Sequence, residues 1–150
     1  MGDGTDGGAR VSQATMTAWA DFVRVGQAVL AAVEADLKAA GFPPLVWYDV
    51  LLELGRAGEA GLRPGALQQR MLLAQYNLSR LLDRMARDGL VERRPCADDA
   101  RGHSVHATAA GLALRQRMWP AYRAAVQARF AGRFSDMEAA TLSALLAKLG

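Results

Sequence analysis

The side chains best suited to recognition chemistry lie in two neighbouring stretches of the 150-residue chain. The first is QYNLSRLLDR, residues 75–84, which carries amide, hydroxyl and guanidinium groups. The second is RRPCADDARGH, residues 93–103, a run rich in charges between two short apolar segments. Amide and guanidinium groups form paired hydrogen bonds with base edges, and arginine also binds phosphate. These residue types indicate a site for a polyanion.

Length and composition limit the classes of protein to which the chain can belong. A chain of 150 residues with 51% hydrophobic and 22% charged residues fits one globular domain with a core. The formal net charge is only +3, so the position of the positive charge matters more than its total. A single cysteine, Cys96, excludes an internal disulfide. Charged residues interrupt each apolar run before the roughly 20 residues that span a bilayer, so no membrane partner and a cytoplasmic location are expected.

Hydrophobic spacing predicts helices on both sides of the polar stretches. Apolar residues recur at helical spacing over residues 16–40, and short helices are expected over residues 45–54 and 64–72. Thr108 is suited to cap a long helix that continues past Pro120. SDME, residues 135–138, matches a capping box that opens a last helix. The glycine-rich start, residues 1–15, is expected to be a disordered tail.

Residues 75–89 give the clearest helical pattern in the chain. The apolar positions follow i, i+3, i+4 and i+7 spacing, which predicts one buried stripe of Leu78, Leu81, Leu82 and Met85. Gly89 is suited to the C-terminal cap. Together with the preceding helix and the hairpin that follows, this pattern predicts a winged helix-turn-helix, a mainly α fold with a small β-hairpin wing.

A helix-turn-helix presents the N-terminal part of its second helix to the major groove of double-stranded DNA. Arg80 can pair with guanine, and Asn77 or Gln75 with adenine. Tyr76 and Ser79 can position the helix on phosphates. The side chains predicted to bind DNA, with those of the wing included, are Gln75, Tyr76, Asn77, Ser79, Arg80, Arg84, Asp99 and Arg101.

The charged run is expected to form the tip of the wing. Arg101 can reach the minor groove, where narrow A·T-rich DNA concentrates negative potential. Asp99 either holds the guanidinium group of Arg101 or caps the turn. Three further arginines contact phosphate or only solvate the lobe, namely Arg87, Arg93 and Arg94.

The sequence resembles the MarR family of winged-helix transcription regulators. The resemblance lies in LSRLLDRMARDGLVERRPCADDARGHSVHATAAG, residues 78–111, and in WYDVLLEL, residues 47–54. It includes Ser79-Arg80 before Leu-Leu, then DGLVERRP, an Asp-x-Arg wing and Thr-x-x-Gly opening a helix. It covers about residues 45–111 in detail, and the ordered combination is more specific than any one motif.

The resemblance implies a homodimer with interlocking N- and C-terminal helices that binds a pseudo-palindromic operator. Residues 16–40 and 109–150 would then be the dimerisation helices, and residues 41–108 the DNA-binding lobe, within a single unit of residues 16–150. The family's role implies a ligand-responsive repressor with a small effector, for which an aromatic or phenolic compound is expected. No cofactor, metal or catalytic residue is expected.

An effector cleft is predicted from aromatic residues and one acid. Such clefts combine aromatic walls with a few polar groups. The candidate effector-binding residues are Trp19, Trp47, Tyr48, Asp49 and Trp119. The alternative is that the aromatic residues belong to the core or to a dimer interface.

Other functions are less compatible with the residues. Cys96 in the charged run permits a redox role, and Cys96 with His103 and His106 permits zinc, although a fourth ligand is not evident. A winged helix that only docks other proteins is an alternative and predicts no salt-dependent DNA affinity. An enzyme is disfavoured because no nucleophile-base pair or phosphate-binding glycine loop is visible.

Overall fold

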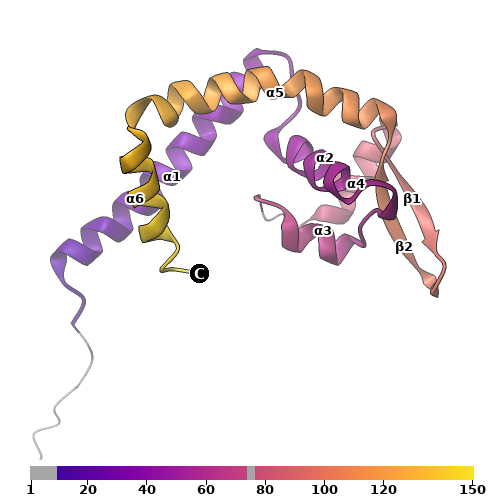
Figure 1. Ribbon diagram of the computed structural model, residues 1–150, viewed down its shortest axis with the longest axis horizontal. Helices are drawn as coiled ribbons and strands as arrows, with labels where there is room; N and C mark the ends of the chain where they lie inside the picture. The colour runs from indigo at the N-terminus through magenta and orange to yellow at the C-terminus, as the bar shows by residue number, and fades with distance from the viewer. Residues whose placement is uncertain (1–9, 74–76) are drawn as a thin grey trace, which may run out of the picture.

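The computed structural model describes residues 10–73 and 77–150. Figure 1 shows an arch, in which α5 (Ala109–Arg129) crosses the top. A lobe of short helices and a hairpin lies below one end of α5, and α1 (Gln13–Ala39) and α6 (Asp136–Leu146) lie below the other. The predicted fold class, mainly α with a small hairpin wing, is confirmed.

Local capping explains where the two outer helices begin. α1 starts at Gln13, about a turn before the expected position, because the Ser12 hydroxyl accepts a hydrogen bond from the Thr15 N–H. Residues 13–15 are therefore helical and not part of a tail, while residues 1–9 of the predicted tail lie outside the described residues. α6 opens with the predicted capping box between Ser135 and Glu138. Gly41, with φ of 81°, turns the chain out of α1.

Three helices form the body of the lobe. α2 (Leu45–Ala57) continues past Gly55 and ends only at Gly58, whose φ of 59° suits glycine. A single turn of 3₁₀ helix, η1 (Gly58–Ala60), and α3 (Pro64–Arg70) follow, with Pro64 in the first turn as expected. α4 (Leu78–Arg87) ends before Gly89, whose positive φ confirms its predicted place at the C-terminus.

The wing is longer than the sequence suggests, and its register shifts between Pro95 and Cys96. β1 (Val91–Cys96) pairs antiparallel with β2 (Asp99–Ala107), so most of the charged run is strand and only residues 97–98 form the tip. Two hydrogen bonds between Leu62 and Val105 join the hairpin to the segment between η1 and α3. This extra pairing supports a two-stranded hairpin that would be marginal alone.

The first turn of α5 is fixed where it meets the wing and α2. The Thr108 hydroxyl donates to the Gly89 carbonyl at 2.6 Å and accepts from the Gly111 N–H at 3.1 Å. A Cβ at Gly111 would collide with the Leu90 carbonyl and lie 2.8 Å from Leu51 Cδ2. The Thr-x-x-Gly pattern therefore combines a helix cap with a close contact between segments. α5 then runs through Pro120 to Arg129, and a short 3₁₀ turn, η2 (Ala131–Arg133), leads to α6.

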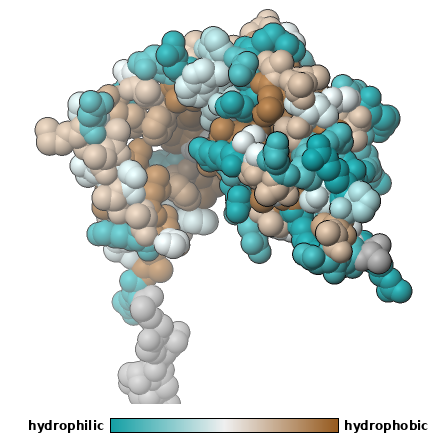
Figure 2. Space-filling view, turned by 45° about the vertical axis from the view of Figure 1, so that its right-hand side comes forward, coloured by the Kyte–Doolittle hydropathy of each residue, from teal (hydrophilic) through white to brown (hydrophobic). Residues whose placement is uncertain are grey.

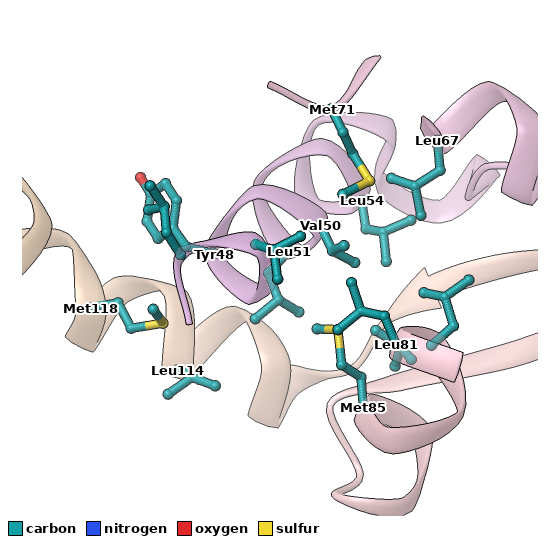
Figure 3. Close-up of a cluster of buried hydrophobic side chains, with 14 of the residues drawn as sticks. Tyr48, Val50, Leu51, Leu54, Leu67, Met71, Leu81, Met85, Leu114 and Met118 are labelled. Atoms are coloured by element: carbon teal, nitrogen blue, oxygen red, sulfur yellow. The ribbon is translucent and has the colours of Figure 1, made fainter. Parts of the chain in front are cut away.

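The core is centred on α2. Figure 3 shows α2 between α5, which contributes Leu114 and Met118, and the helices α3 and α4. Those two helices contribute Leu67, Leu81 and Met85, all essentially inaccessible to solvent. None of the helices among the described residues is long and apolar enough to cross a membrane.

The Gly111 contact gives a stability prediction. Gly111→Ala should lower the free energy of unfolding by about 1–3 kcal/mol, because the added methyl group overpacks a junction bounded by backbone. Urea unfolding followed by circular dichroism, at matched protein concentration, measures the change. Gly65→Ala is the matched control: a Cβ there meets nothing within 4 Å, so the free energy of unfolding should stay unchanged or rise by up to about 1 kcal/mol, because alanine favours the helix more than glycine does. Equal effects of the two substitutions would contradict the packing argument.

Candidate nucleic-acid interface and effector cavity

α4 is built to present one polar face. Its predicted apolar stripe of Leu78, Leu81, Leu82 and Met85 is buried, which confirms the periodicity. The exposed side carries Ser79, Arg80, Asp83, Arg84 and Arg87. The polar face of α4 is therefore open to solvent and accessible to a partner.

The N-terminus of α4 is capped by one of the predicted DNA-binding residues. Asn77 is the N-cap, and its Oδ1 accepts a hydrogen bond from the Arg80 N–H at 3.2 Å. The Asn77 amide N–H₂ remains available to donate, whereas a paired contact with adenine requires Oδ1 to accept a second hydrogen bond. Gln75 and Tyr76, also predicted to bind DNA, lie outside the described residues.

At the wing, Asp99 shapes the turn and does not hold the guanidinium group of Arg101. Asp99 Oδ1 accepts from the Arg101 backbone N–H at 3.0 Å, and Asp99 Oδ2 lies 3.5 Å from Arg63 Nη1. The backbone hydrogen bond is the main reason that the pKa of Asp99 lies below its usual value, and the charge of Arg63 adds to the effect. Of the two alternatives raised by the sequence, turn capping is the one observed, because the i, i+2 backbone N–H lies closer than the flexible side chain.

Ion pairing divides the arginines of the lobe into two groups. Arg93 Nη1 lies 2.7 Å from Asp83 Oδ1, and Arg94 pairs with Glu92. Within the described part of the chain, the other exposed arginines of α4 and the wing have no acidic partner: Arg80, Arg84, Arg87 and Arg101. The arginines predicted to contact DNA therefore keep their full charge, whereas Arg93 and Arg94 are largely neutralised.

A shallow hollow of about 550 Å³ lies on the lobe between α3, α4 and the wing. It brings Asn77 and Ser79 together with Arg93 and His103, which the sequence did not link to them. Arg80, Arg84 and Arg101 are not among its lining residues. This hollow marks where the two motif helices and the wing share one surface.

A second cavity, of about 310 Å³, lies between α2, the end of α3 and α5. Its lining includes two predicted effector residues, Tyr48 and Asp49, both buried. Asp49 Oδ2 accepts a hydrogen bond from the Leu73 N–H at 2.8 Å, so this carboxylate also holds the main chain at Leu73, after the end of α3. The cavity thus shares a residue with the support of the helix-turn-helix.

The structure does not gather all five predicted effector residues. Trp119 stacks on Tyr48 with ring centroids 6.3 Å apart, but it does not line the cavity. Trp47 is half-buried and Trp19 is exposed, with its ring 6.4 Å from that of Phe22, and neither lines the cavity. An aromatic residue type alone does not distinguish a cavity wall from an interface. The prediction from sequence therefore placed in one cleft residues that lie apart in the fold.

Several lining residues were missed by the sequence reasoning. Glu53 and Arg56 lie on α2, Arg70 ends α3, and Tyr122 comes from α5. Glu53 follows Asp49 by one helical turn, a spacing that puts both carboxylates on one face and was a usable signal. No sequence pattern links Tyr122 to Asp49, because their common place in the cavity wall depends on how α5 crosses α2.

His106 and Cys96 of the wing line neither the hollow nor the cavity, whereas His103 lines the hollow. His106 is buried, with its Nε2 2.8 Å from the Ser104 hydroxyl, while His103 is exposed. Cys96 is partly buried in β1. Among the residues that the structure describes, no three His, Cys, Asp or Glu side chains are grouped to hold a metal ion.

Comparison with known proteins agrees with this geometry. The MarR family profile matches residues 40–102. Sco3205, a MarR family regulator from Streptomyces coelicolor solved in complex with DNA, is 20% identical, with 96% of this chain and 90% of that chain covered and a TM-score of 0.85. AbsC from the same organism is 23% identical, with coverage of 94% and 95% and a TM-score of 0.80.

A mutant of MarR from E. coli complexed with operator DNA is 24% identical, with coverage of 94% and 99% and a TM-score of 0.77. No curated protein sequence matches the chain. Residues 40–102 carry the family's sequence, and the solved structures share the fold along nearly the whole length. Residues 40–102 are therefore similar to the MarR family, and the chain shares the winged-helix fold of these solved structures.

Proposed function

We propose that this protein is a sequence-specific regulator of transcription that binds double-stranded DNA through α4 and the wing. The observation that carries the proposal is the exposed polar face of α4, where Arg80 and Arg84 have no acidic partner among the described residues. Arg101 on β2 is exposed and unpaired in the same sense. A face with free guanidinium groups is suited to a polyanion, because each contact releases counterions from the duplex.

The two parts of the interface have different tasks in this proposal. Arg80, in the first turn of α4, reads a base edge in the major groove, and Ser79 and Arg84 fix the helix on the backbone. Arg101 binds the neighbouring minor groove or its phosphates, with its main chain positioned by Asp99. Gln75, Tyr76 and Asn77 complete the predicted contacts at the helix start.

The outer helices support a homodimer. Exposed large apolar side chains cluster on α1, on α6 and on the turn before α6: Met16, Trp19, Phe22, Val25, Leu30, Phe130, Phe134, Met137, Leu145 and Leu146. Figure 2 shows apolar residues on the inner side of the arch, between the limb with α1 and α6 and the lobe. An apolar surface of this extent on a monomer is unfavourable in water. A second copy of the chain would bury it.

This arrangement defines the proposed division of labour. Residues 41–108 form the DNA-binding lobe, and residues 16–40 and 109–150 form the dimer. A two-fold dimer places its recognition helices about one DNA turn apart, roughly 34 Å, and reads a pseudo-palindromic operator. The protein then acts as a ligand-responsive repressor in the cytoplasm, where the DNA lies, with the cavity at Asp49 as the effector site.

The DNA contacts are tested by substitution. Arg80→Ala should lower affinity for a selected duplex by about 10- to 100-fold, corresponding to the loss of one base contact. Arg101→Ala should reduce the slope of log affinity against log salt by about 1, as expected for one lost phosphate contact. Mobility shifts with a duplex enriched from a random library measure both effects.

The matched control for this experiment is Arg24→Ala, which removes the same charge from α1, outside the lobe. Its affinity and salt slope should equal those of the wild type. If the wild type shows no salt-dependent DNA affinity, a protein-docking winged helix becomes the better interpretation.

The dimer is tested on α6. Leu145→Asp places a charge on the exposed apolar side of α6 and should shift the protein from dimer to monomer in sedimentation velocity at micromolar concentration. Leu72→Asp is the control, because Leu72 is equally apolar and still more exposed but lies on the lobe. A wild-type protein that sediments as a monomer would refute the proposed assembly.

A further inference from the structure

The acidic and basic side chains that line the effector cavity differ in how deeply they are buried. Four charged side chains line it: Asp49, Glu53, Arg56 and Arg70. Both acids are buried, with 5% and 7% of their surface exposed, whereas both arginines are exposed. The interior of the cavity is therefore acidic and only its rim is basic.

Of the two buried acids, Asp49 has the weaker compensation. Glu53 Oε1 lies 2.6 Å from Arg56 Nη1, so an arginine already neutralises it. Asp49 receives one backbone N–H, from Leu73, on Oδ2. No described residue donates a hydrogen bond to Asp49 Oδ1 or forms an ion pair with Asp49. A buried carboxylate of this kind is stabilised by a cation more than by any other partner.

Aromatic rings line the cavity next to this carboxylate. The rings of Tyr48 and Tyr122 meet edge to face with centroids 5.0 Å apart, and Trp119 lies 6.1 Å from Tyr122. Burial is the main cause of the raised pKa of the Tyr122 hydroxyl, and the charge of Tyr48 in its ionised form and that of the Asp49 carboxylate raise it further. The phenol therefore stays neutral, and its ring face attracts cations.

The basic rim does not reverse this preference. Arg56 is already paired with Glu53, and Arg70 is exposed at the end of α3, where water and salt screen its charge. An anionic ligand inside the cavity would have to approach the carboxylate of Asp49, which pairs with no cationic side chain among the described residues. Apolar side chains such as Leu45 and Leu52 complete the wall and favour a ligand with an apolar body.

We propose that this cavity binds a small organic cation, an amine or quaternary ammonium group on an apolar body, with its charge against Asp49 and the rings of Tyr48 and Tyr122. The site also reports its occupancy to α4. Asp49 holds the Leu73 N–H, four residues before the N-cap Asn77. A cation that draws this carboxylate toward itself weakens that hydrogen bond and lowers DNA affinity, a coupling that rests on the proposed function.

Ligand class is tested by calorimetry on the full chain with two probes of similar size and opposite charge, benzyltrimethylammonium and phenylacetate. The wild type should bind the cation at least about tenfold more tightly. A tighter complex with phenylacetate, or no heat of binding with the cation at millimolar concentration, would overturn the cation site.

Substitutions locate the charge. Asp49→Asn keeps an oxygen that can accept from Leu73 but removes the charge, and it should weaken cation binding at least about tenfold. Asp21→Asn, which removes the same charge from the exposed surface of α1, should bind as the wild type does. Tyr122→Leu, which removes an aromatic face, should also weaken the cation. Wild-type affinity in both Asp49→Asn and Tyr122→Leu would refute the assignment.

The coupling is tested with the duplex that the protein enriches from a random library. Saturating benzyltrimethylammonium should lower the DNA affinity of the wild type at least about fivefold and leave that of Asp49→Asn unchanged. Unchanged wild-type affinity would overturn the coupling while DNA binding itself stands. Failure to enrich any duplex would overturn the proposed function and the coupling together, and the calorimetry would still decide the cation site.

Discussion

The burial of α2 on two sides is the constraint on which the rest of the structure depends. One side of this helix packs against α5, and the other packs against α3 and α4 (Figure 3). Val50, Leu51 and Leu54 lose essentially all contact with water, and burial on this scale is the main favourable term in folding. Because α2 packs against α5 as well as against α3 and α4, a movement of α5 would displace the helix that supports α3 and α4.

The buried helix α2 also carries two buried carboxylates. Burying Asp49 and Glu53 costs desolvation energy, and apolar residues at such positions are often equally or more stabilising. Glu53 pairs with Arg56, three residues further along α2, whereas the hydrogen bond to Asp49 among the described residues comes from the Leu73 N–H. Asp49 therefore joins the cavity of about 310 Å³ to the main chain at Leu73, beyond the end of α3.

Local sequence patterns predicted the helices and their caps well. The positions that depend on long-range contacts could not be predicted from these patterns. The stripe of Leu78, Leu81, Leu82 and Met85 follows from helical periodicity, and the box at Ser135 follows from capping chemistry. The meeting of Tyr122 with Asp49 depends on the crossing of two helices about 70 residues apart, which periodicity does not encode. Asp99 illustrates the same limit at short range, because residue types allowed both a side-chain and a backbone partner and only the turn geometry selects one.

The same ion pairs that neutralise some arginines also fix the interface. A lobe that binds DNA must hold its helix and wing at one spacing, because the grooves of a duplex have fixed widths. Arg93 on β1 and Asp83 on the exposed side of α4 join these two elements at 2.7 Å, and Arg63 and Asp99 join the wing to the residue before α3. Both pairs are partly exposed, so each contributes little to stability and more to orientation. The net charge of +3 thus combines two kinds of arginine. Paired arginines hold the wing and the helices at one spacing. Arginines without an acidic partner among the described residues, such as Arg80 and Arg101, remain available to phosphates and bases.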